Sequence, residues 1–191
     1  MSLAMVLTGG RIVLAPVFFL FFQLAVAGPG WLLLPLWIVL LLIELSDLFD
    51  GVAARAFGKE SEIGKILDPC ADSISRLTYF LCLGSIGLMP LWVLLVLVYR
   101  DVGVAYIRVM ISRSKVLMPA RTSGKVKAWI YAVAGIGGVA VFTLGRLGVG
   151  AGSEPMVRTF LTILFVLCAA VAAWSLLDYF VFFRKNFRRA S

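Results

Sequence analysis

Four aspartates between residues 47 and 72 are the side chains of this sequence best suited to chemistry. They form two pairs, Asp47 with Asp50 and Asp68 with Asp72. At these spacings both members of a pair lie on one face of a helix, and a turn between two such helices would bring the pairs together. Four carboxylates that meet at one point cannot all stay ionised unless a cation joins them. Carboxylate oxygens suit Mg²⁺ or Mn²⁺, which proteins commonly bind together with substrate phosphates.

The composition places these carboxylates in a membrane protein. Of the 191 residues, 62% are hydrophobic and only 15% are charged, which is more apolar surface than a soluble domain of this size can bury. The formal net charge of +8 suits an anionic membrane surface and phosphorylated substrates, and no soluble basic face remains to bind nucleic acid. The sequence has no histidine, so carboxylates are the plausible bases and most zinc sites are excluded.

Six stretches are long and apolar enough to cross a bilayer. The second continues as a helix through the first aspartate pair to Arg55. We predict an all-α, polytopic integral membrane protein with six transmembrane helices, forming a single domain over residues 1–191. The predicted spans are residues 12–26, 31–45, 66–87, 91–111, 128–144 and 156–183.

Charge sets the predicted orientation. Basic residues follow the second and fourth spans and fill the tail after residue 183, whereas the connectors 27–30 and 88–90 have none. By the positive-inside rule, both termini and the aspartate-rich turn face the cytoplasm. We therefore expect a polar active-site cavity that opens to the cytoplasm.

The aspartates belong to a longer pattern, Asp-x2-Asp-Gly-x2-Ala-Arg-x8-Gly-x3-Asp-x3-Asp. This pattern resembles the signature of the CDP-alcohol phosphotransferases, membrane enzymes of phospholipid biosynthesis. All eight signature positions match: Asp47, Asp50, Gly51, Ala54, Arg55, Gly64, Asp68 and Asp72.

The resemblance implies a role for each signature residue. The aspartates would hold two metal ions, either Mg²⁺ or Mn²⁺, with Asp72 and Asp68 as the catalytic pair and Asp72 as the candidate base. The metal ligands would be Asp47, Asp50, Asp68 and Asp72. The CDP moiety would bind at Asp50, Gly51, Ala54, Arg55 and Gly64. An acceptor hydroxyl would attack the phosphorus of CDP-diacylglycerol that carries the lipid and expel CMP.

Three further stretches resemble the bacterial phosphatidylglycerophosphate synthases of this family. They are the opening 7–11 with Pro16, Arg100-Asp101 with Arg108, and the stretch 124–127. The resemblance implies sn-glycerol 3-phosphate as acceptor, a homodimer, and a bacterial inner membrane. The acceptor phosphate would meet Thr8, Arg11, Arg108, Lys125 and Lys127.

Two positions depart from those synthases. Ser73 stands where they usually have Lys directly after the last signature aspartate, and Ala128 stands where they have Thr. Arg76 lies one turn after Asp72 and could supply the missing charge or simply pair with that aspartate.

Other functions stay open from the sequence. Within the family, another acceptor such as inositol phosphate would give the same CMP release. Membrane prenyltransferases also use aspartate-rich helices, but they are typically longer and their two motifs lie far apart in sequence. A cation transporter could use buried aspartates as its ion site, and it would show ion flux without CMP release.

Overall fold

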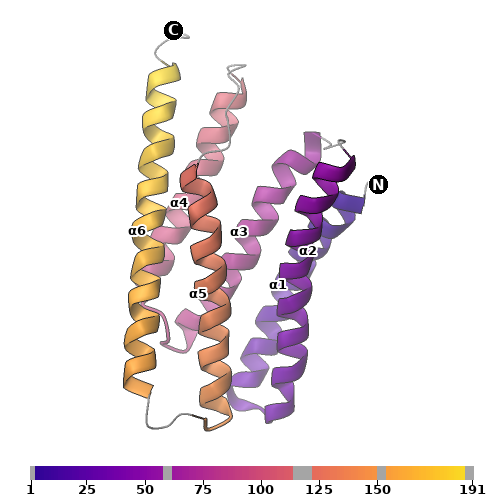
Figure 1. Ribbon diagram of the computed structural model, residues 1–191, viewed down its shortest axis with the longest axis vertical. Coiled ribbons are helices and arrows are strands. Elements are labelled where there is room, and N and C mark those ends of the chain that lie inside the picture. Colours follow the sequence, from indigo (N-terminus) through magenta and orange to yellow (C-terminus); the bar gives the residue numbers. More distant parts are fainter. Residues whose placement is uncertain (1–2, 58–61, 114–121, 150–153, 188–191) are drawn as a thin grey trace. The chain divides into compact units, whose positions relative to one another are not determined.

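In a computed structural model of the protein, the described residues are 3–57, 62–113, 122–149 and 154–187, with side chains over 8–47, 49, 67–111, 123–149 and 155–185. These residues form six α-helices and one 3-10 helix, and no strand occurs among them (Figure 1). The all-α prediction is confirmed. The elements are α1 (Leu3–Ala27), η1 (Gly30–Leu32), α2 (Leu33–Phe57), α3 (Glu62–Ser85), α4 (Leu91–Arg113), α5 (Thr122–Arg146) and α6 (Glu154–Phe187).

Four of these helices contain segments that are long and apolar enough to span a membrane. The segments are Thr8–Ala27, Gly30–Asp47, Ser123–Arg146 and Pro155–Lys185. Helices α3 and α4 carry charged residues inside their sequences, among them Asp72 and Arg76 in α3 and Arg100 and Asp101 in α4. The chain is thus a multi-pass membrane protein, and the number of six spans stays a prediction.

The helices form two compact units. The first comprises Met1–Cys82 with Phe142–Ala151, and the second comprises Leu83–Val141 with Gly152–Ser191. Each unit contains its own buried polar groups among apolar side chains. The expectation that residues 1–191 form a single domain stays a prediction.

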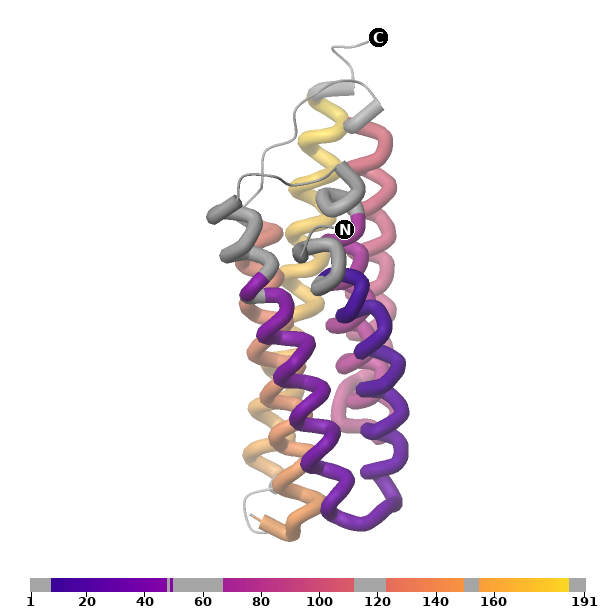
Figure 2. Tube along the Cα trace, turned by 90° about the vertical axis from the view of Figure 1, so that its right-hand side faces the viewer, coloured from indigo at the N-terminus to yellow at the C-terminus, as the bar shows by residue number. Residues whose placement is uncertain are grey.

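In the first unit, α1 and α2 form an antiparallel hairpin (Figure 2). The turn depends on Gly28, whose N–H donates to the Leu24 carbonyl at 2.9 Å, because a Cβ at Gly28 would lie 2.4 Å from that same oxygen. Aromatic contacts join α1 to the rest of the unit. Phe18 meets Tyr79 of α3 edge-on at 4.8 Å between centroids, and these rings are fully buried or nearly so. This packing places the first turns of α1 beside the aspartates of α2 and α3.

In the second unit, α4 packs along α6. The two helices approach closely at Gly103, where an added Cβ would lie 3.0 Å from Leu176. The connection into α4 turns at Gly87, which has a φ of +73°, a value that glycine adopts without strain. Close approach of α4 and α6 is what lets polar side chains meet in the interior of this unit.

Candidate active site

Asp47 of α2 and Asp72 of α3 lie side by side in the first unit, joined by one arginine. The Nε of Arg76 donates to Asp72 Oδ1, and its Nη2 lies 3.4 Å from Asp47 Oδ2. Arg76 follows Asp72 by four residues, so both project from the same face of α3. Of the two roles that the sequence left open for Arg76, the structure shows the pairing with Asp72, and the arginine also reaches Asp47 of the neighbouring helix.

Helix α1 supplies the third side of this site. Arg11 Nη1 donates to Asp47 Oδ1, and the Thr8 hydroxyl donates to Asp68 Oδ1. Thr8 and Arg11 are three residues apart on α1 and are both buried, so one face of this helix meets both aspartate pairs. The structure therefore brings these two residues, which the sequence analysis assigned to the acceptor phosphate, to the carboxylates.

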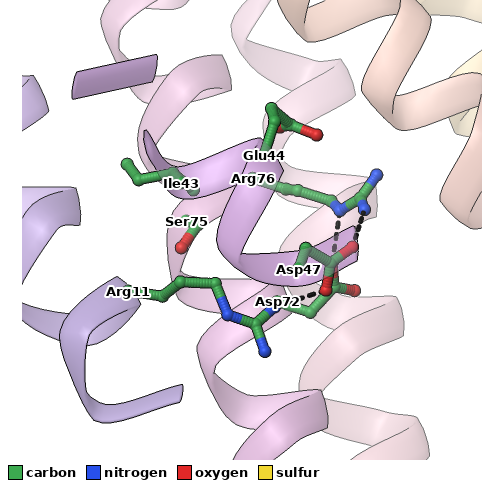
Figure 3. Close-up of a pocket in the computed structure, with 7 residues that line it drawn as sticks. All are labelled: Arg11, Ile43, Glu44, Asp47, Asp72, Ser75 and Arg76. Carbon is green, nitrogen blue, oxygen red and sulfur yellow. Dashed lines mark hydrogen bonds and ion pairs between the residues drawn. The ribbon is translucent and has the colours of Figure 1, made fainter. Parts of the chain in front are cut away.

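The carboxylates are more open than the arginines that hold them. The side chain of Asp47 is 39% exposed and that of Asp72 is 26% exposed, whereas Arg11 and Arg76 are 2% and 8% exposed. Figure 3 shows the two aspartates between the two guanidinium groups. Each of these carboxylates contacts a buried arginine and is also partly exposed. Its exposed oxygens are therefore available to a ligand.

Glu44 is a further carboxylate of the same pocket, and it was not among the predicted site residues. It lines the pocket with Arg11, Asp47, Asp72 and Arg76, and it acts electrostatically on Arg76 (Figure 3). The spacing contained the signal, because Glu44 lies three residues before Asp47 and so shares its helix face. The eight-residue signature does not include this position.

The other signature positions have side chains outside the described set. Asp50, Gly51, Ala54 and Arg55 lie in the last turns of α2, and Gly64 lies in the first turn of α3. Among the side chains that are described, no three of the types Asp, Glu, His and Cys converge so as to hold a metal ion. The four-aspartate site and the CDP site thus remain predictions.

A second polar cluster lies inside the second unit. Arg100 Nη1 and Lys127 Nζ both donate to Asp101 Oδ1, at 2.8 and 2.7 Å, and Arg100 Nη2 donates to the Ser175 hydroxyl at 2.8 Å. All four residues are buried. Because two cations share one carboxylate, this cluster has a formal excess of one positive charge.

Arg108 and Lys125, the other residues assigned to the acceptor phosphate, also belong to the second unit. Arg108 Nη2 donates to the Tyr179 hydroxyl at 3.1 Å, and its guanidinium lies 5.5 Å from the centre of that ring. Lys125 is exposed, whereas Lys127 is buried on Asp101. The five assigned residues thus divide between the two units, with Thr8 and Arg11 in the first.

Helix α6 contributes polar groups that the sequence analysis did not use. Ser175 accepts from Arg100, Asp178 accepts from the Ser123 hydroxyl at 2.7 Å, and Tyr179 accepts from Arg108. The sequence contained a signal for these residues. Ser175, Asp178 and Tyr179 are separated by three and four positions in an apolar stretch of α6, so they lie on one face of the helix.

The sequence profile of the CDP-alcohol phosphatidyltransferase family matches residues 1–177. The chain belongs to this family. Members of the family generally depend on a divalent metal ion.

Curated relatives are similar over part of the chain. A Mycobacterium tuberculosis protein named "Probable phosphatidylglycerophosphate synthase" is 32% identical over 70% of this chain and 63% of its own length. A Treponema pallidum protein named "CDP-diacylglycerol--glycerol-3-phosphate 3-phosphatidyltransferase" is 35% identical over 49% of this chain and 44% of its own length. A Streptomyces coelicolor protein named "Cardiolipin synthase (CMP-forming)" is 40% identical over 38% of this chain and 32% of its own length. Each match covers less than two thirds of the relative.

The donors in the first unit fit a divalent ion in their chemistry. Asp47 and Asp72 present partly exposed carboxylate oxygens from facing helices, and the Asp68 carboxylate lies on the same helix as Asp72. Hard cations prefer such oxygens.

Proposed function

We propose that this protein transfers the phosphatidyl group of CDP-diacylglycerol to sn-glycerol 3-phosphate, giving phosphatidylglycerophosphate and CMP. The observation that carries the proposal is the complete eight-residue signature in a chain of the CDP-alcohol phosphatidyltransferase family. The names of the Mycobacterium and Treponema relatives support the acceptor.

The metal ligands we propose are Asp47, Asp50, Asp68 and Asp72, with Mg²⁺ or Mn²⁺ as the ion. A bound divalent ion would supply positive charge to the phosphate oxygens of the nucleotide-linked substrate. Arg11 and Thr8 fix the directions of the Asp47 and Asp68 carboxylates, because each donates to one carboxylate oxygen and is itself buried. Since phosphoryl-type transfer depends mainly on positioning and charge, such fixed oxygens favour the reaction.

The same carboxylates would accept the proton of the acceptor hydroxyl. The sequence has no histidine, so we propose Asp72 as base, with Asp68 as its catalytic partner. Asp72 is 26% exposed, which leaves room for an approaching hydroxyl, and Arg76 holds its Oδ1.

For the nucleotide we propose Asp50, Gly51, Ala54, Arg55 and Gly64 as the CDP-binding residues. The forked guanidinium of Arg55 would pair with the pyrophosphate, since arginine matches phosphate oxygens in bidentate fashion. Glycines without side chains would let the cytidine approach the backbone. The family membership and the spacing of these positions support this assignment.

For the acceptor phosphate we propose Arg108, Lys125 and Lys127, with Thr8 and Arg11 as further candidates. The cluster around Asp101 supports an anion site in the second unit, because Arg100 and Lys127 bring two cations to one buried carboxylate. Arg108 adds a further cation on the Tyr179 hydroxyl. A phosphorylated acceptor would suit these basic side chains.

We place the protein in a bacterial inner membrane with both termini and the active site on the cytoplasmic side, as a homodimer. The distribution of basic residues supports the orientation, and the family membership supports the membrane location. Substrate lipid would enter from the bilayer and the phosphorylated acceptor from the cytoplasm.

The acceptor is tested by identifying the lipid product. Purified protein in detergent is given CDP-diacylglycerol, Mg²⁺ and an equimolar mixture of sn-glycerol 3-phosphate and inositol phosphate, and lipids are separated by mass spectrometry. Phosphatidylglycerophosphate as the main product supports the proposal. A lipid product that contains inositol phosphate would show that the proposed acceptor is wrong, while the phosphatidyl transfer itself would stand.

A second acceptor has a specific observation in its favour. The Streptomyces relative, 40% identical over its matched 72 residues, is named a CMP-forming cardiolipin synthase, so a lipid hydroxyl of phosphatidylglycerol is the alternative acceptor. The same assay with phosphatidylglycerol in place of glycerol phosphate distinguishes them, since only the alternative gives cardiolipin.

A further inference from the structure

Tyr179 of α6 contacts two arginines of α4. Its hydroxyl accepts a hydrogen bond from Arg108 Nη2 at 3.1 Å, and the centre of its ring lies 5.5 Å from the Arg108 guanidinium and 5.8 Å from that of Arg100. At these distances the electron-rich face of an aromatic ring attracts a cation. All three residues belong to the second unit, so one tyrosine acts on two cations of the neighbouring helix.

The tyrosine is the buried member of this group, and Arg108 is the accessible one. Tyr179 is only 2% exposed, whereas Arg108 is exposed. Leu176, three residues before Tyr179, lies against α4 at Gly103, where an added Cβ would lie 3.0 Å from it. This close packing fixes the part of α6 that carries the tyrosine. A long arginine side chain that is already held by a fixed partner loses less conformational freedom when a ligand binds.

The hydroxyl of Tyr179 also lies beside the first turn of α5. A Cβ at Gly124 would lie 3.4 Å from the hydroxyl oxygen. The stretch 124–127 that begins at this glycine contains Lys125 and Lys127, which we propose as ligands of the acceptor phosphate. Tyr179 therefore holds Arg108 of α4 near the end of α5 that carries these lysines.

We propose that Tyr179 is a positioning residue for the acceptor phosphate, because it holds the Arg108 guanidinium where that group binds the phosphate. A guanidinium has five N–H donors, more than the hydrogen bond to Tyr179 uses, and it pairs with phosphate oxygens in a forked geometry. This inference rests on the proposed function, in which Arg108 binds the acceptor phosphate. It gives α6, which contains none of the predicted site residues, a part in acceptor binding.

Steady-state kinetics of the full chain in detergent tests this role. Tyr179→Phe removes the hydroxyl and keeps the ring. The KM for sn-glycerol 3-phosphate should therefore rise about 3- to 10-fold, as the net loss of one hydrogen bond predicts, while kcat and the KM for CDP-diacylglycerol stay near those of the wild type. An unchanged KM for glycerol phosphate, or a fall in kcat without a change in that KM, would overturn the proposal.

Tyr106→Phe is the matched control for the loss of a hydroxyl. Tyr106 lies on α4 in the same unit and is 66% exposed. We expect all three constants of this variant to equal those of the wild type. A rise in the KM for glycerol phosphate as large as that of Tyr179→Phe would overturn the proposal, because the effect would not be specific to the residue that holds Arg108.

A double-mutant cycle tests whether Tyr179 acts through Arg108. Tyr179→Phe should raise the KM for glycerol phosphate in the wild-type background and should have no further effect in the Arg108→Met background. The same factor in both backgrounds would mean that Tyr179 acts independently of Arg108, which would overturn the proposal.

Binding of inorganic phosphate, measured by isothermal titration calorimetry, needs no turnover and separates this role from the proposed function. The dissociation constant should rise about 3- to 10-fold in Tyr179→Phe and stay unchanged in Tyr106→Phe. This result, together with a wild type that releases no CMP, would support the role of Tyr179 and contradict the proposed function. CMP release by the wild type, together with equal phosphate affinities for the wild type and Tyr179→Phe, would support the function and overturn the role of Tyr179.

Discussion

Arg11 of α1 and Asp47 of α2 form an ion pair between residues separated by 36 positions in the sequence. The arginine is almost fully buried and the aspartate is partly exposed, so the rigid partner directs the accessible one. Together with the Thr8–Asp68 hydrogen bond, this pair makes α1 part of the carboxylate site.

Replacing Arg11 with Met should reduce transfer more than it reduces stability. Loss of the guanidinium frees Asp47 to turn away, and a misdirected ligand typically costs one to two orders of magnitude in rate, so CMP release should fall roughly 10- to 100-fold. The unfolding free energy should fall by about 1–3 kcal/mol, the cost of an unsatisfied buried group. Rates and thermal unfolding in detergent check both values, with Arg11→Lys as the conservative control. Equal rates for Arg11→Met and wild type would show that the pair does not position Asp47.

Asp101 and Lys127 should depend on each other for the stability of the second unit. Asp101→Asn leaves the buried cations Arg100 and Lys127 without the carboxylate that they share, and breaking a buried pair costs about 3–5 kcal/mol. The double variant Lys127→Met/Asp101→Asn should recover part of that loss, because one of the two cations is then removed with the carboxylate. Thermal unfolding of the two single variants and the double variant measures the coupling. Additive losses would mean that the two side chains act independently.

Lys125 should affect the acceptor without affecting the fold. It is exposed, so Lys125→Met removes a positive charge without leaving a buried group unpaired. The KM for glycerol phosphate should rise about tenfold, as loss of one charged phosphate contact predicts, while the KM for CDP-diacylglycerol stays near that of the wild type. Steady-state kinetics with each substrate varied in turn checks this, and Lys125→Arg should retain most of the affinity. An unchanged KM for glycerol phosphate would exclude Lys125 from the acceptor site.

Much of the fold was predictable because apolar runs in a membrane protein are long and are bounded by charged or turn residues. The expected stretch 31–45 with its extension to Arg55 corresponds to α2, which ends at Phe57, and the break at Gly28–Pro29 is where α1 stops. Spacing alone also predicted the Arg76–Asp72 pair, since it is local to one helix.

The partners from other helices could not be predicted from the sequence. The pairing of Arg11 with Asp47 and of Lys127 with Asp101 depends on how helices pack, which a one-dimensional pattern does not contain. Lys127, a predicted phosphate ligand, also donates to the Asp101 carboxylate, and the spacing of the sequence does not reveal this contact. Glu44 was missed for a different reason, because its signal is a spacing that falls outside the recognised signature.

Release of CMP by the purified protein tests the central claim most directly. The protein is incubated in detergent with CDP-diacylglycerol, Mg²⁺ or Mn²⁺ and glycerol 3-phosphate, and CMP is measured beside an Asp68→Asn variant. We expect CMP release that requires both the metal and the acceptor and that falls by at least about 100-fold in the variant, because a ligand and catalytic carboxylate is lost. Absence of CMP from folded, metal-loaded wild type with every acceptor tested, together with cation flux in proteoliposomes, would contradict the transferase and favour a transporter.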